Sequence, residues 1–267
     1  MKRTFTPFAA LAAALLLATS AHAQTQTPAQ SFAAAIAALN APLGPTAEFR
    51  APPAPGDAAT TKSLSDIKTA MDALGTPAFP IDGANTFTAV CAPLTQIGLR
   101  YVLSGANDVP GFKENGQSST PAMQALESAN STRYQDALML FAAENTRCTA
   151  LHLPWYSQMW AGLSDADRAA RLDSTHQIRS GIAQMFINAA QSATQPAFSK
   201  PNRDLAITTA ATYADTFASV LPVSERAQLL VQIAQIAPNL AADYPKEFAT
   251  IVKALARTDC TGLCTAP

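Results

Sequence analysis

Apolar residues recur at helical spacing along most of this chain. Leu64, Ile67, Met71 and Leu74 lie three or four positions apart, and Gly75 follows where a left-handed residue would end a helix. No segment alternates apolar and polar residues with the period of two that marks a half-buried strand. The pattern predicts an all-α fold, a single domain of about eight helices. The same spacing predicts further helices over 85–103, 120–151, 164–189, 202–220, 224–236 and 245–255.

Prolines and capping residues predict where these helices begin and end. Thr120 and Pro121 have the residue types favoured at the N-cap and the first helical position. We expect the helix that follows them to end near residue 151, because Pro154 is the typical first residue of a new helix. That short helix would end at Gly162, and Asn202 is the expected N-cap of a later one.

The first 23 residues have the pattern of a secretory signal peptide. Lys2 and Arg3 precede an apolar stretch over 8–18, and small residues at Ala21 and Ala23 form a cleavage site. The stretch is shorter than the roughly 20 residues that a membrane-spanning helix needs. We therefore expect a periplasmic or secreted protein with no integral membrane segment after cleavage. An uncleaved signal that anchors the chain is the alternative.

Polar and proline-rich sequence separates this segment from the main run of helices. Five prolines between residues 42 and 55 disfavour helix, although 31–39 has the spacing of a short one. We interpret 24–61 as an N-terminal tether, 62–257 as the helical domain and 258–267 as a C-terminal tail. A strap that lies on the domain surface is the alternative for residues 42–60.

Four cysteines follow the signal, at positions 91, 148, 260 and 264. An even number of cysteines in an exported chain favours two disulfides, and three pairings are possible. We favour Cys91–Cys148, which would join two predicted helices, and Cys260–Cys264, which would close a small loop. Zinc binding by the second pair is the competing interpretation, but no histidine lies nearby, so we predict no metal site.

The composition fits closely packed helices. About a fifth of the residues are alanine, the best helix former, and only 14% are charged. The formal net charge is −1, and removal of Lys2 and Arg3 leaves 16 basic against 19 acidic side chains. Nucleic acid is therefore excluded as a partner, because phosphate contacts require a basic surface.

Candidate chemistry is concentrated in the segment 144–160. Glu144, Cys148 and His152 are spaced by four residues, so they share one face if the helix continues that far. In that case His152 is a candidate general base or metal ligand beside Glu144, or simply a histidine near a helix end. His176 lies three residues after Asp173 and is a further candidate, although a solvated helix face explains it equally well.

Aromatic residues in the same segment suggest a contact surface. Trp155, Tyr156, Met159 and Trp160 form two pairs on adjacent helix faces, so one buried stripe does not accommodate all four. The polar loop 105–119 is the second candidate contact region. Packing in the core is the alternative for most of these aromatic side chains.

Two functional hypotheses follow from the sequence. The first is a non-catalytic binding or accessory role with a protein or an envelope component, without a cofactor. The second is an envelope hydrolase or lyase that uses His152, Glu144 or His176. The chain has no phosphate-binding glycine loop, no Gly-x-Ser-x-Gly motif and no His-Glu-x-x-His motif, so the first hypothesis is preferred.

Overall fold

Helices form the architecture of this protein. The computed structural model describes residues 26–110, 112 and 120–266, and within these ranges there are nine helices of seven or more residues and no strand. The all-α prediction is confirmed, whereas the predicted signal peptide lies outside the described residues. The long helices are α1 (Pro28–Asn40), α2 (Ala58–Asp72), α4 (Ala92–Val102), α6 (Pro121–Arg133), α7 (Gln135–Ala161), α9 (Leu172–Thr194), α10 (Lys200–Thr212), α12 (Val223–Ile236) and α14 (Pro245–Leu255).

Short elements connect the long helices. A π-helical turn, Phe87–Cys91, joins the short helix α3 (Ala84–Thr86) to α4. None of the helices in the described ranges is long and apolar enough to cross a membrane. The short α-helices are α3 (Ala84–Thr86), α8 (Asp165–Ala170), α11 (Ala214–Ala218) and α13 (Leu240–Asp243).

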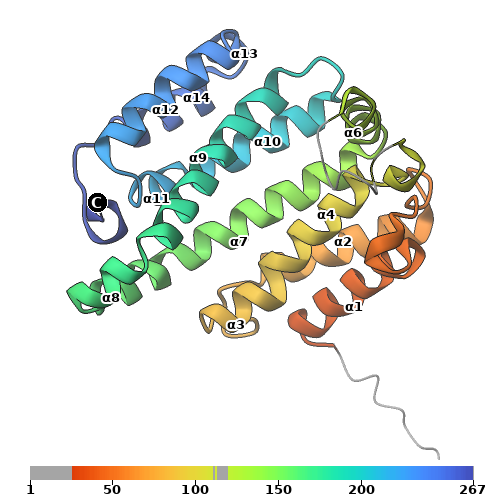
Figure 1. Ribbon diagram of the computed structural model, residues 1–267, viewed down its shortest axis with the longest axis horizontal. Coiled ribbons are helices and arrows are strands. Elements are labelled where there is room, and N and C mark those ends of the chain that lie inside the picture. The colour runs from red at the N-terminus through yellow and green to blue at the C-terminus, as the bar shows by residue number, and fades with distance from the viewer. Residues whose placement is uncertain (1–25, 111, 113–119, 267) are drawn as a thin grey trace, which may run out of the picture.

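Helix α7 lies at the centre and contributes to two hydrophobic cores. Its first half packs Phe141 and Cys148 into a core with α1, α2 and α4. Its second half packs Leu153 and Trp160 into a core with α9, α10, α12 and α14. Figure 1 shows α7 crossing the middle of the molecule, with these two groups of helices on opposite sides.

Helix α7 continues through Pro154, so the prediction of a new helix at this residue is wrong. Pro154 lacks the N–H that would bond to the preceding turn, but its ring is exposed to solvent. His152, Leu153 and Trp160 on either side of it are buried. Burial of these neighbours stabilises the helix against the lost hydrogen bond, and Gly162 ends it as expected.

Capping interactions set the starts of two other helices. Helix α10 begins at Lys200, because the Ser199 hydroxyl accepts a hydrogen bond from the Asn202 N–H, so Asn202 is not the cap. Helix α2 begins at Ala58, because the Asp57 carboxylate accepts from the Thr60 N–H at 2.9 Å. The predicted cap at Thr120 is confirmed, with its side chain accepting from the Met123 N–H.

The range 24–61, predicted as a tether, contributes a helix to the core. Phe32 and Leu39 of α1 are each only 2% exposed and pack with α2 and α4. The proline-rich stretch that follows α1 is held by Arg100 of α4, which donates to the backbone oxygens of Leu43 and Gly44. This stretch therefore lies against the helices.

Both predicted disulfides are present. Cys91–Cys148 joins the π-helical turn to α7, and Cys260–Cys264 closes a small loop in the C-terminal tail. The first bridge links residues that are 57 positions apart and is buried in the core. A loop of this length corresponds to about 4 kcal/mol of lost chain entropy in the unfolded state.

Two buried arginines hold the C-terminal tail against the domain. Arg226 is 0% exposed and donates to the backbone oxygens of Leu221, Arg257 and Asp259 at 2.5–2.7 Å. Arg179 is 2% exposed and donates to the backbone oxygen of Leu263 at 2.5 Å. Charged donors satisfy several tail carbonyls at once, so the tail is part of the folded unit.

We expect Arg226→Met to lower the free energy of unfolding by about 3 to 5 kcal/mol, because three buried or partly buried carbonyls lose a charged donor. Chemical denaturation measures the change, and limited proteolysis should show earlier cleavage in the tail. Arg171→Met, at an exposed position, is the matched control. Equal stability of the two variants would contradict this account of how the tail is held.

Candidate functional site

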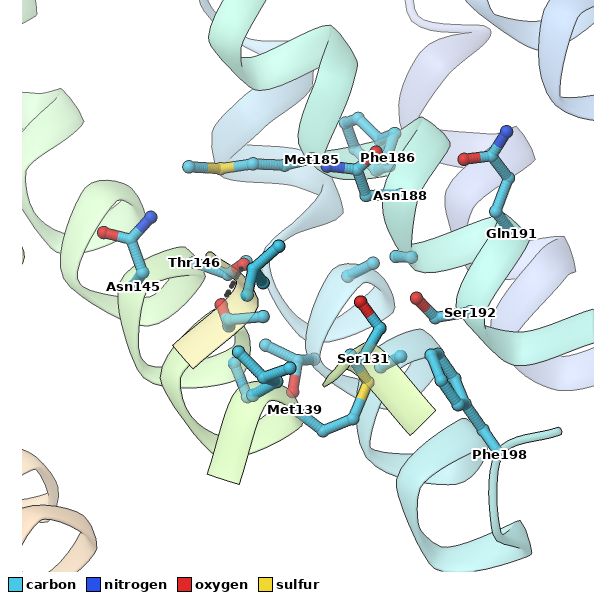
Figure 2. A pocket seen from close by; sticks show the side chains of 18 of the residues that line it. Ser131, Met139, Asn145, Thr146, Met185, Phe186, Asn188, Gln191, Ser192 and Phe198 are labelled. Atoms are coloured by element: carbon cyan, nitrogen blue, oxygen red, sulfur yellow. Dashed lines mark hydrogen bonds between the residues drawn. The ribbon is translucent and has the colours of Figure 1, made fainter. Parts of the chain in front are cut away.

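A cavity of about 360 Å³ lies beside the central helix, mainly between α7, α9 and α10. Its volume is at the lower end of the range of about 300–1,000 Å³ found for small-molecule sites. Figure 2 shows the lining side chains pointing into this space from several helices. The lining residues are Val102, Ser131, Leu138, Met139, Ala142, Ala143, Asn145, Thr146, Met185, Phe186, Asn188, Ala189, Gln191, Ser192, Phe198, Ala206, Thr209, Ala210 and Phe217.

The cavity lining is uncharged. None of the described residues that line it is Asp, Glu, Lys, Arg or His. Met139, Met185 and Phe186 supply polarisable and aromatic surface, and alanines on all three helices leave the space open. An ion would lose its hydration here without gaining a counter-charge, so the cavity is suited to an uncharged, mainly apolar molecule.

The short connection between α9 and α10 contributes one residue to the cavity lining. Phe198 from this connection lines the space, and the next residue, Ser199, donates its N–H to the Gln135 side-chain oxygen at 2.7 Å. The Asn202 amide donates to Asp136 Oδ1 at 2.6 Å and to the Gln135 side-chain oxygen at 3.1 Å. These bonds fix the connection to the start of α7 and so position Phe198.

His152 is buried beside the Cys91–Cys148 disulfide, away from the cavity. Its side chain is 0% exposed, and its Nδ1 lies 2.7 Å from the Cys148 backbone oxygen. Because a carbonyl oxygen only accepts, we infer that Nδ1 carries the proton. Nε2 has no hydrogen-bond partner among the described residues, and the Phe87 ring meets the imidazole edge-on. This arrangement gives His152 a packing role and no access for a substrate.

The structure offers one group of possible metal-ligand atoms in the ranges it describes. Single atoms of Cys91, Cys148 and His152 lie within 4.8 Å of one another. Both sulfurs are joined in the disulfide, so neither is the thiolate that binds a metal.

Glu144 is buried on α7 between the two cores. It is 6% exposed, and burial raises the pKa of its carboxyl from 4.5 to about 7, against the opposing attraction of Arg147. Arg147 Nη1 lies 3.8 Å from Glu144 Oε2 but only 2.6 Å from Asp72 Oδ1. The guanidinium is therefore paired mainly with Asp72, which leaves the Glu144 carboxyl incompletely compensated.

His176 lies in a different part of the molecule from His152. It is exposed on α9 and lines a separate hollow of about 190 Å³ beside Arg179 and Glu225. No hydrogen bond or ion pair joins it to Asp173 among the described contacts. Helix α7 continues to Ala161, so Glu144 and His152 do lie on one helix, but the structure does not gather the three candidate catalytic residues at one cavity.

The four aromatic and sulfur-containing residues of the predicted contact surface divide between interior and surface. Trp160 is 4% exposed and belongs to the core, whereas Trp155, Tyr156 and Met159 are partly exposed. The Trp155 ring lies so close to Gly83 that no side chain fits at that position.

In the predicted loop 105–119, Ala106 and Phe112 are buried against the preceding helix end and α6. Residues 111 and 113–119 lie outside the described residues.

The cavity-lining residues have no distinctive sequence signal. They are apolar residues, serines, threonines and side-chain amides at ordinary helical spacing, which predicts a packed interface. The hollow depends on the distance between α7, α9 and α10, and no residue pattern records that distance.

Comparison of the chain with protein-family models, with curated proteins and with solved structures finds no match.

We expect Glu144→Gln to stabilise the protein at pH 8 by on the order of 2 to 3 kcal/mol. Burial raises the pKa of the Glu144 carboxyl in the folded protein. Below about pH 4.5 the carboxyl is mainly protonated in both the folded and the unfolded state, so it does not lower the free energy of unfolding there. Stability is lost as the pH rises from about 4.5 to about 7, where only the unfolded state releases the proton readily.

Urea denaturation of both proteins at pH 4.5 and pH 8 measures this difference. The benefit of Glu144→Gln should be present at pH 8 and nearly absent at pH 4.5. Glu127→Gln, at a partly exposed position on α6, is the matched control for the loss of one carboxyl group. A constant difference at the two pH values would show that Glu144 does not titrate as expected.

Proposed function

We propose that the protein is an exported, non-catalytic binding protein that holds a small, uncharged and mainly apolar molecule in the cavity between α7, α9 and α10. The observation that carries this proposal is the uncharged lining of a cavity of about 360 Å³. Burial of apolar ligand surface would supply the binding free energy, at roughly 25 cal/mol for each Å² removed from water.

Export is part of the proposal. It is supported by the signal-like residues 1–23 and by two disulfides, which persist in oxidising compartments. An envelope location also suits the ligand, because membranes are the main source of uncharged apolar molecules in a cell. A hydrolase or lyase that uses His152, Glu144 and His176 has less support, since these residues do not share a cavity.

Binding of N-phenylnaphthylamine, an uncharged aromatic probe, tests the proposal. Its fluorescence rises when it leaves water, and we expect saturable binding of one probe per chain. Ala189→Phe should weaken this binding at least about tenfold, because Ala189 lines the cavity and the larger ring occupies part of it.

Ala234→Phe, at an exposed position on α12, is the matched control and should bind like the unchanged protein. Circular dichroism melting of both variants checks that they fold. Absence of saturable binding, or equal binding by a folded Ala189→Phe variant, would refute the proposed site.

A further inference from the structure

Two serine hydroxyls in the cavity have no hydrogen-bond partner among the described residues. Ser131 is on α6 and Ser192 is on α9, and both are partly buried. Figure 2 shows both hydroxyls pointing into the space between the helices. Each is therefore available to a bound molecule.

Other polar side chains of the lining are already engaged with the protein. The Thr146 hydroxyl donates to the Ala142 backbone oxygen at 2.8 Å. Asn145 Oδ1 accepts from Thr95, and Asn188 Oδ1 accepts from Gln184. A helical serine commonly satisfies its hydroxyl in the way that Thr146 does, by bonding to the preceding turn. The two serine hydroxyls thus differ from these three side chains.

The chemistry of these hydroxyls limits the ligand. A hydroxyl both donates and accepts, so a pair of them can bind the oxygen of an alcohol or of a carbonyl group. A carboxylate would also accept from them, but it would enter a cavity whose lining offers no positive side chain. Apolar side chains such as Met139, Met185 and Phe186 make the larger part of the remaining lining.

We infer that the ligand is an uncharged apolar molecule with a single hydroxyl or carbonyl group, whose oxygen is bound by Ser131 and Ser192. This inference rests on the proposed function, because it assigns the polar end of the molecule that the cavity binds. The two serines determine specificity, whereas the apolar lining supplies most of the affinity.

Three molecules that share one ring system separate these contributions: naphthalene, naphthol and naphthoate. Each is used to displace N-phenylnaphthylamine from the purified protein at neutral pH. We expect naphthol to bind about tenfold more tightly than naphthalene, as one well-formed buried hydrogen bond allows. Naphthoate should bind at least about tenfold more weakly than naphthalene, because its charge is not compensated.

The double variant Ser131→Ala, Ser192→Ala identifies the groups involved. Alanine is well tolerated in helices, so the variant should fold, and its affinity for naphthol should fall to the level of naphthalene. Its affinity for naphthalene should not change. Ser180→Ala, at an exposed position on α9, is the matched control and should preserve the preference for naphthol.

Thr209 on α10 carries a third lining hydroxyl without a partner in the described structure, and Thr209→Val tests it separately. Loss of the naphthol preference in Thr209→Val alone would overturn the assignment to Ser131 and Ser192. Equal binding of naphthol and naphthalene, or tightest binding of naphthoate, would overturn the inference and leave the cavity proposal standing. Failure of N-phenylnaphthylamine itself to bind would overturn both.

Discussion

The structure depends on one helix that is packed on both sides. Helix α7 has 27 residues and contributes side chains to both large hydrophobic cores, so neither group of helices is complete without it. This constraint explains why Pro154 does not end the helix. The lost backbone hydrogen bond costs about 3 kcal/mol in a helix interior, but burial of Leu153 and Trp160 requires the helix to continue.

The same constraint explains where the cavity lies. Helix α10 packs against both α7 and α9, and the alanines on these helices are too small to fill the space between them at every level. Small side chains bring helix backbones close together at most contacts. Ser131 of α6 and Phe198 of the connection between α9 and α10 line the space that remains.

Local sequence signals predicted much of the fold but only part of the candidate site. The Thr120 cap of α6 and the start of α14 at Pro245 depend on neighbouring residues in the chain, so the sequence predicted both. The two disulfides are the pairing that the cysteine spacing and the predicted export favoured among three possible ones. The continuation through Pro154 and the burial of Phe32 are tertiary effects, and the sequence predicted neither.

The shared face of Glu144, Cys148 and His152 illustrates the same limit for chemistry. Their spacing correctly placed them along one helix, but it did not reveal that His152 is enclosed by a disulfide and Phe87. Nor did it reveal that Asp72 takes the strong contact with Arg147. Accessibility and partner choice are set by other helices, so spacing along one helix identifies candidates without showing whether they can act.

The buried charges of the molecule lie apart from the cavity. Arg226 and Arg179 are occupied by carbonyls of the C-terminal tail, and Glu144 belongs to the group that includes Arg147 and Asp72. None of them lines the space between α7, α9 and α10. A buried charge needs a partner of its own, and a ligand that brought one would find only amides, hydroxyls and apolar groups. The cavity therefore offers no counter-charge to an ion, because the charged groups of the fold are paired elsewhere.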